Sequence, residues 1–214
     1  MDARSVAITA TLLFGIVSPG AGQIRVGAKG GFNRSSVSLK IADEKVDTDS
    51  RSGYHVGGLV YFGFSATTGL QIEGLYTKKG FERADSQADS LEANSLMNDA
   101  FEFAYWEVPV LLMFTSPKAM TQPRLFFGPT IGFESSCTRK TGGFGEDENE
   151  MERPCLPGET KSTDIGFMAG IGVKVTSLTI DFAFEWGFKD ILESEVESLK
   201  NRNLSVSFGV VLPN

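Results

Sequence analysis

Apolar and polar residues alternate with a period of two along most of the chain. This alternation predicts β-strands, because successive side chains of a strand point to opposite faces of the sheet. The segment 178–189 shows it most clearly, with an apolar face made of Leu178, Ile180, Phe182, Phe184, Trp186 and Phe188. Polar and small residues occupy the opposite face. Such an aromatic-rich face is typical of a strand with one side against lipid.

Seven further segments repeat the alternation, and each is long enough to cross a bilayer as a tilted strand. They are residues 24–33, 53–64, 69–81, 101–114, 124–135, 164–175 and 203–212. No segment has a sustained helical period, and the acidic stretch 190–201 is the single candidate for a helix, a short one within a loop. We therefore expect eight strands in total.

The connections between these segments alternate in length. Four long polar connections span 34–52, 82–100, 136–163 and 190–202, and the three short ones span 65–68, 115–123 and 176–177. Outer-membrane barrels have tight turns at the periplasmic rim and long loops outside. The sequence therefore predicts an all-β protein, a closed antiparallel eight-stranded transmembrane β-barrel of up-and-down topology in the outer membrane of a Gram-negative bacterium.

The composition agrees with this interpretation and excludes other classes. With 24 Gly, 17 Phe and 1 His, the chain suits close-packed, aromatic-rich barrel strands better than a helical enzyme. Beyond the N-terminal segment, no stretch approaches the roughly 20 apolar residues of a membrane-spanning helix. The net charge of -7 argues against nucleic acid as a partner, since phosphate binding requires clustered Lys and Arg.

The N-terminal segment has the organisation of a secretory signal peptide. Arg4 gives a short basic region, residues 6–17 are apolar, and small residues at 18–22 form a cleavage site before Gln23. We expect a signal peptide at 1–22 and a single barrel domain at 23–214, with a short membrane anchor or a misassigned start codon as the alternatives. Export would place Cys137 and Cys155 in an oxidising compartment, where we expect them to form a disulfide.

The alternation also places charged residues of both signs on the inner face of the barrel. Side chains fill the interior of an eight-stranded barrel, and an isolated buried ion is very costly. We therefore expect a network of salt bridges and hydrogen bonds, with a proton or ion pathway as the alternative. Its expected members are Arg25, Lys29, Glu73, Glu107, Arg124, Lys174, Asp181 and Glu185.

Two groups of residues are candidates for chemistry. Glu73 and Glu107 lie on adjoining strands and could act as paired carboxylates. His55, with Ser50 or Ser52 nearby in sequence, could serve an envelope-lipid hydrolase. The first pair is expected to be neutralised by lumenal bases, and the histidine lacks a motif that positions a nucleophile. We expect no catalytic residues, no cofactor and no metal ligands from these groups.

Two further features concern the loops and the strand ends. The acidic run 146–150, between the two cysteines, could bind calcium but lacks the Asp-x-Asp-x-Asp-Gly spacing of a dedicated site. A solvated loop is the simpler interpretation. Aromatic residues near the predicted strand ends are expected to anchor the barrel at the two interfaces, namely Tyr54, Phe62, Phe64, Tyr76, Phe81, Phe101, Phe103, Tyr105, Trp106, Phe114, Trp186 and Phe188.

Three segments and one tripeptide resemble the PorT-like outer-membrane β-barrel family. They are Val-Gly-Ala-Lys-Gly-Gly-Phe-Asn at 26–33, Leu-Gln-Ile-Glu-Gly-Leu-Tyr-Thr-Lys-Lys-Gly at 70–80, Tyr-Trp-Glu-Val-Pro-Val-Leu-Leu at 105–112 and Phe-Gly-Pro at 127–129. The resemblance implies an eight-stranded barrel, and the name-giving member belongs to machinery that exports proteins across the outer membrane. We expect a structural or surface-recognition protein in contact with outer-membrane lipid; the alternative is a barrel component of a secretion complex with periplasmic or outer-membrane protein partners.

Overall fold

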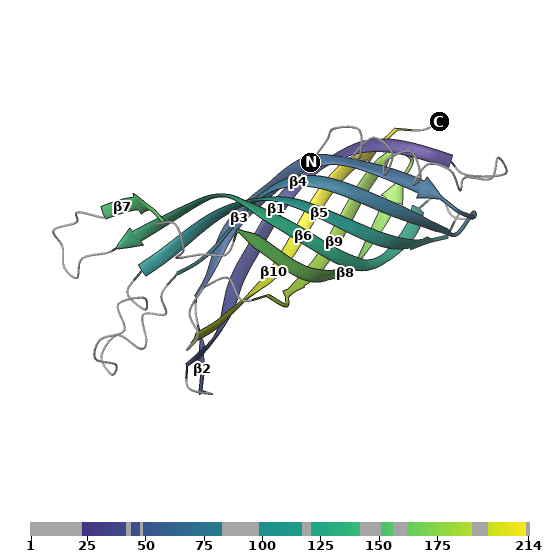
Figure 1. The fold of residues 1–214 in the computed structure, drawn as a ribbon. Coiled ribbons are helices and arrows are strands. Elements are labelled where there is room, and N and C mark those ends of the chain that lie inside the picture. The colour runs from purple at the N-terminus through teal and green to yellow at the C-terminus, as the bar shows by residue number, and fades with distance from the viewer. Residues whose placement is uncertain are drawn as a thin grey trace, which may run out of the picture.

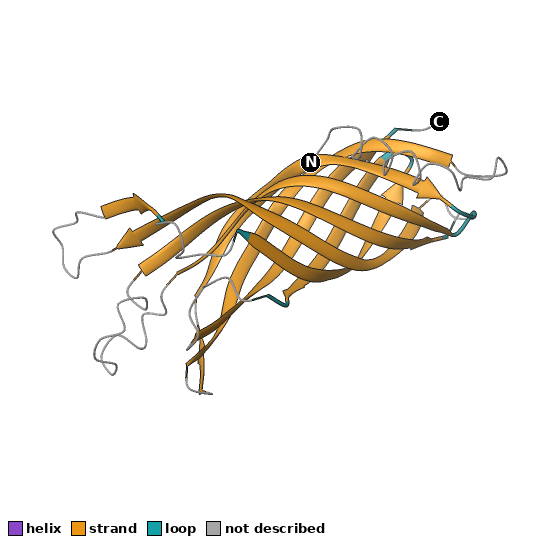
Figure 2. Ribbon diagram, in the orientation of Figure 1, coloured by secondary structure: helices purple, strands orange, loops and turns teal. Residues whose placement is uncertain are grey.

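The computed structural model describes residues 23–41, 44–47, 49–82, 99–116, 121–141, 151–155, 162–189 and 197–212. Almost all of these residues are in β-strands (Figure 2). The strands are β1 (Gln23–Ile41), β2 (Glu44–Asp47), β3 (Asp49–Gly63), β4 (Thr68–Glu82), β5 (Asp99–Thr115), β6 (Thr121–Thr141), β7 (Met151–Pro154), β8 (Thr163–Val175), β9 (Leu178–Gly187) and β10 (Glu197–Val211). The predicted signal peptide lies outside the described residues.

Eight of the strands form a closed antiparallel barrel. Their order is β1-β3-β4-β5-β6-β8-β9-β10, and β10 closes the ring by pairing with β1 over a register that includes Gly30 opposite Phe208. β2 and β7 are short strands that pair only with the ends of β1 and β6. The predicted fold is confirmed. A closed ladder leaves no strand edge unpaired, as hydrocarbon requires.

The two ends of the barrel differ. β2 and β7 lie beyond the same end, and the C-terminus lies at the other (Figure 1). We call the first the hairpin end, because β2 and β7 pair there with β1 and β6. We call the second the turn end, because residues 64–67 and 176–177 make tight connections at that end. Among the described residues, no helix is long and apolar enough to cross a membrane.

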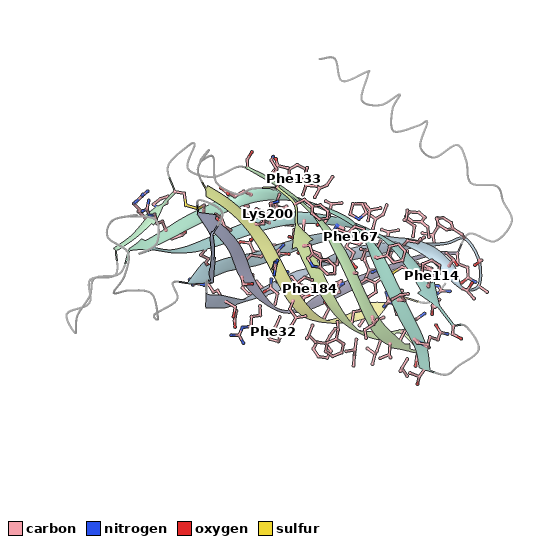
Figure 3. The ribbon with its side chains drawn as sticks, turned by 90° about the horizontal axis from the view of Figure 1, so that it is seen from below. Phe32, Phe114, Phe133, Phe167, Phe184 and Lys200 are labelled. Carbon is pink, nitrogen blue, oxygen red and sulfur yellow. A yellow bond between two sulfur atoms is a disulfide. The ribbon has the colours of Figure 1, made fainter. Side chains whose placement is uncertain are left out.

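The outer wall is apolar on every strand of the barrel. Phe32 is 72% exposed and Phe133 is 50% exposed. Side chains such as Phe32, Phe114 and Phe133 project away from the ribbon (Figure 3). In water such a surface would be very unfavourable, whereas in a bilayer it meets lipid. Two expected interface anchors are exceptions, since Phe103 and Tyr105 point inward and are completely buried.

The strands extend further than predicted at the hairpin end. β1 continues to Ile41 and β6 to Thr141, past the predicted ends at residues 33 and 135. β10 begins at Glu197, so the predicted helix is wrong over 197–201; its remainder, 190–196, lies outside the described residues. The run of apolar residues at outward positions ends near Phe32 of β1 and Phe133 of β6, although the backbone pairing continues.

Part of the barrel interior is apolar, which the sequence analysis did not anticipate. Leu111, Met113, Phe126, Met168 and Ala183 form a buried cluster, with the ring of Tyr61 packed against it. Gly170 provides room for this cluster. A Cβ atom at Gly170 would lie 2.4 Å from the nearest ring carbon of Phe126, which is closer than van der Waals contact allows.

Candidate functional site

The polar side chains inside the barrel are the first candidate for a functional site. Six of the eight expected charged residues are buried there, namely Lys29, Glu73, Glu107, Arg124, Asp181 and Glu185. The other two, Arg25 and Lys174, are half-buried near the turn end. The alternation of the strands directs all eight inward, and their partners are set by the way the barrel closes.

One group of charges lies in the middle of the barrel. The Lys29 ammonium donates to both carboxylate oxygens of Glu73, at 3.0 and 3.1 Å. Gln71 donates to the same carboxylate and accepts a 2.9 Å hydrogen bond from Arg124. Arg124 also lies 3.5 Å from Asp181. Two cations therefore face two acids, and four strands are tied together.

A second group lies nearer the hairpin end and is centred on Lys79. Its ammonium group is completely buried, donates to Glu107, and lies 2.7 Å from Glu185. Glu185 also accepts hydrogen bonds from Thr130 (3.0 Å) and Asn203 (3.4 Å). The sequence analysis missed Lys79, although it continues the inward face that carries Gln71 and Glu73 on the same strand.

The Lys79 group contains more acceptors than donors. Asp164 is 7% exposed and accepts a 2.8 Å hydrogen bond from Asn201 through Oδ2. Its Oδ1, together with the hydroxyl of Tyr105 and Oδ1 of Asn203, has no hydrogen-bond partner among the described residues. Lys79 pairs with two of the three buried acids of this group, Glu107 and Glu185, so the carboxylates outnumber the cations.

The turn end of the lumen has the opposite character. A cavity of about 30 Å³ lies between Arg25, Arg124 and Lys174, and none of the described residues that line it is an acid. The guanidinium of Arg25 sits 5.6 Å from the ring centroid of Tyr61. Such a space holds no more than a water-sized group. The lumen is thus positive at the turn end and rich in carboxylates toward the hairpin end.

The candidates for catalysis do not assemble as proposed from sequence. His55 bonds through Nε2 to Ser207 of β10 at 2.8 Å, and not to Ser50 or Ser52. His55 is 5% and Ser207 is 3% exposed, so a lipid ester could reach them only if the barrel opened. Ser52 lies exposed on the other face of β3.

The structure does not bring Glu73 and Glu107 together as a catalytic pair. Glu73 is held by Lys29 and Gln71, whereas Glu107 is held by Lys79 in the other group. The two acids thus belong to separate ion pairs.

Among the described residues, no group of three or more His, Cys, Asp or Glu side chains could hold a metal ion. The acidic run 146–150 lies outside them.

Cys137 and Cys155 form a disulfide at the hairpin end. Their Cα atoms are 5.4 Å apart, and the two cysteines are 18 positions apart in sequence. The Cys155 amide also donates to the Cys137 carbonyl at 3.1 Å, so the bridge joins directly paired residues next to the β6–β7 ladder. Closing a loop of this size restricts the unfolded chain and is worth about 3 kcal/mol.

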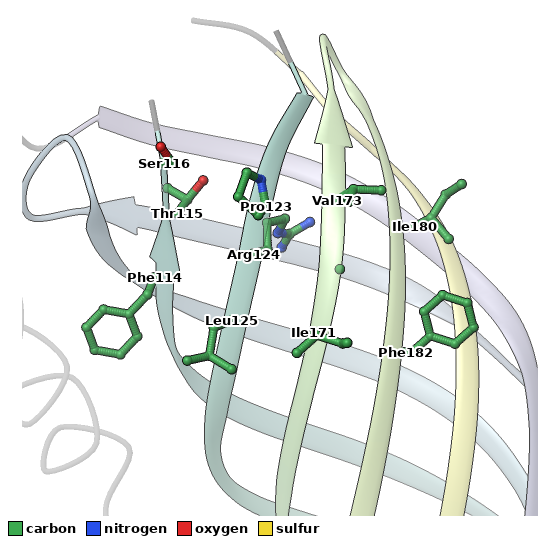
Figure 4. A pocket seen from close by; sticks show the side chains of 11 residues that line it. Phe114, Thr115, Ser116, Pro123, Arg124, Leu125, Ile171, Val173, Ile180 and Phe182 are labelled. Atoms are coloured by element: carbon green, nitrogen blue, oxygen red, sulfur yellow. The ribbon is translucent and has the colours of Figure 1, made fainter. Parts of the chain in front are cut away.

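A groove on the outside of the barrel lies near the turn end. It has a volume of about 620 Å³, and its lining comes from the outer wall of β5, β6, β8 and β9. Leu125, Ile171 and Phe182 are among the apolar side chains that surround it (Figure 4). Because it opens from the lipid-facing wall, acyl chains of the bilayer would fill it.

Comparisons with known proteins agree with this architecture. The sequence profile described as outer membrane protein beta-barrel domain matches residues 17–193. The chain is similar to the attachment invasion locus protein Ail of Yersinia pestis, solved in complex with the heparin analogue sucrose octasulfate, at 16% identity and a TM-score of 0.45 over 89% of this chain and 99% of that one. For Neisserial surface protein A the identity is 11% and the TM-score 0.45, over 89% of this chain and 99% of that one.

A third similar structure is the translocator domain of the autotransporter NalP from Neisseria meningitidis. Its identity is 10% and its TM-score 0.33, over 97% of this chain and 98% of that one. No curated protein matches the sequence.

Proposed function

The chain belongs to the family of outer membrane protein beta-barrel domains, and from this premise we propose that it is a sealed membrane anchor that presents its hairpin end for recognition at the cell surface. Membership places the protein in the outer membrane of a Gram-negative bacterium. In such barrels the long connections face outward and the tight turns face the periplasm. The hairpin end is then the extracellular end.

The observation that carries the proposal is that, among the described residues, paired strands extend beyond the lipid-facing wall only at this end. β6 continues from the exposed Phe133 to Thr141, pairs there with β7, and is joined to it by the Cys137–Cys155 disulfide. At the turn end, by contrast, β8 and β9 are joined by two residues. A disulfide across paired strands lowers the conformational entropy that the segment can lose when it binds a partner.

The interior supports an anchoring role over a transport role. Buried ion pairs and the apolar cluster around Phe126 occupy the lumen from one side to the other. A pore would need a continuous path of water through these groups. The function is therefore assigned to the surface at the hairpin end.

Replacing residues 138–154 with a short turn tests the proposal. Cells carrying the intact or the trimmed barrel would be compared for adherence to immobilised glycans and matrix proteins, with equal amounts of folded barrel in the membrane fraction verified by heat-modifiable migration. We expect adherence to depend on the hairpin. Equal adherence of both strains and of a strain without the barrel would refute the recognition role.

A second candidate is a barrel component of a protein-secretion complex. The resemblance of segments 26–33, 70–80 and 105–112 to the PorT-like family supports it. Deleting the gene would then leave secreted proteins in the periplasm, and the intact barrel would restore their export. Normal secretion by the deletion strain would eliminate this role, while loss of adherence alone would favour recognition.

A further inference from the structure

Basic side chains follow directly after the apolar wall on neighbouring strands. The outward-facing apolar run of β10 ends at Leu204, that of β1 at Phe32 and that of β4 at Tyr76. On each strand the next outward position toward the hairpin end holds a cation, namely Arg202, Arg34 and Lys78. Arg51 of β3 and Lys200 of β10 lie close to the same level. We call these five cations the basic rim.

Barrel closure makes the rim continuous between β10 and β1. Arg202 pairs with Ser36 and Leu204 pairs with Arg34, so Arg34 and Arg202 are diagonal neighbours on the outer face. Both side chains are exposed. Arg34 also donates through Nε to the hydroxyl of Ser50 on β3. Residues at opposite ends of the sequence therefore form one surface.

The rim continues across β3 and β4. Glu102 of β5 forms two ion pairs. Its Oε1 lies 2.9 Å from the Lys78 ammonium, and its Oε2 lies 2.8 Å from the Arg51 guanidinium. The Lys78 ammonium also lies 5.9 Å from the ring centroid of Tyr54, and Tyr54 pairs with Phe32 on β1. Two cations thus share one acid, directly above exposed aromatic rings.

Among the side chains that the structure describes, basic groups outnumber acids at this level on one side of the barrel. Outside the lumen, the charged side chains of residues 23–36, 50–80, 102–116 and 200–212 are these five cations and Glu102. On β6, β8 and β9, the described outward-facing positions in and next to the lipid-facing wall carry neither Lys nor Arg. The protein as a whole is acidic, at -7, so the clustering is not a consequence of composition.

We propose that the basic rim binds the phosphate groups of a phosphorylated glycolipid in the outer leaflet. Guanidinium and ammonium groups are the side chains that pair best with phosphate. The cations lie where headgroups begin, since Phe32 is 72% exposed to the acyl region immediately below. A phosphorylated glycolipid is complementary to both the apolar wall and the basic rim, because its acyl chains cover the wall while its phosphates pair with the cations of the rim.

Removing three rim cations tests the proposal. The wild-type barrel and the variant Arg34→Gln/Lys78→Gln/Arg202→Gln would be folded in zwitterionic detergent and titrated with bis-phosphorylated lipid A, with bound lipid counted by native mass spectrometry. The control Arg139→Gln/Arg153→Gln/Lys189→Gln removes three cations elsewhere. A cation at a membrane surface changes lipid affinity about fivefold, so the rim variant should bind about a hundredfold more weakly.

The control should bind lipid A as the wild type does, and heat-modifiable migration verifies that each variant is folded. Equal binding by the rim variant and the wild type would overturn the proposal, as would equal weakening by both variants. Equally tight binding of phosphatidylglycerol, or of dephosphorylated lipid A, would also refute the proposal, because the phosphorylated glycolipid would then not be preferred. Displacement of lipid A by inorganic phosphate at millimolar concentration would indicate a free-anion site instead, and would also refute it.

Discussion

Replacing Lys79 with methionine is the sharpest test of the interior. Lys79 is buried completely and is held between Glu107 and Glu185, whose side chains are 5% and 6% exposed. Methionine keeps the length and much of the volume of the side chain but removes the charge. Two carboxylates would then lose their common cation in a site that water does not reach.

The expected loss of stability follows from the burial of all three groups. Removing one partner of a buried ion pair costs about 3–5 kcal/mol, because the remaining charge is left without compensation. Here one substitution exposes two acids to that penalty, and Asp164 lies in the same group. We expect Lys79→Met to lower the free energy of unfolding by at least about 4 kcal/mol.

Lys78 gives a matched control in the next position of the same strand. It points outward, its side chain is 36% exposed, and it pairs with Glu102 at 2.9 Å. Exposed ion pairs contribute about 0–1 kcal/mol. Lys78→Met should therefore change the free energy of unfolding little, although the two substitutions are chemically identical.

The assay is urea-induced unfolding in lipid vesicles, followed by tryptophan fluorescence and heat-modifiable migration. A third variant, Lys79→Met/Glu107→Gln/Glu185→Gln, removes all three charges and should recover most of the loss, because neutral groups of similar size are tolerated where ions are not. A loss below about 1 kcal/mol for Lys79→Met, or a triple variant less stable than the single one, would refute the reasoning.

Two further predictions concern the hairpin and the apolar cluster. Trypsin should cut the double variant Cys137→Ser/Cys155→Ser within the β6–β7 hairpin much faster than the oxidised wild type, while the barrel stays intact. The reason is that the variant lacks the disulfide, whose closure of the loop contributes about 3 kcal/mol. Equal cleavage rates would contradict this prediction. Gly170→Leu should prevent formation of the heat-modifiable barrel, because a Cβ there overlaps the Phe126 ring. Gly74→Leu is its control, since a Cβ at Gly74 meets nothing within 4 Å, and equal folding yields would contradict the packing argument.

The strands could be predicted because lipid imposes a local pattern. A residue that faces the bilayer must be apolar and its neighbours face inward, so the alternation around Phe182 and Trp186 identifies a strand without reference to any other part of the chain. The same rule directed Glu73 and Glu185 to the lumen. At the hairpin end the rule fails, since beyond Arg34 of β1 the apolar residues move from even positions to the odd positions 37, 39 and 41, while the strand pairing continues.

Most charged residues of the lumen could be predicted, although Lys79 and Asp164 were missed, but their partners could not. Alternation is a property of one strand, whereas Lys79 reaches Glu185 from 106 positions away in sequence. Which side chains meet depends on the stagger with which the sheet closes, and this is a property of all eight strands together. The same holds for His55 and Ser207, and for the neighbouring positions of Arg34 and Arg202 across the β10–β1 closure.

The sequence by itself therefore determined the fold class, the number of strands and the inward or outward direction of most side chains, because each depends on a period of two and on the presence of lipid. The tertiary structure alone decided the ion pairs, the apolar cluster and the basic rim. These features depend on register and closure, which bring distant residues together. The two-residue alternation along one strand constrains neither the register between strands nor the closure of the barrel.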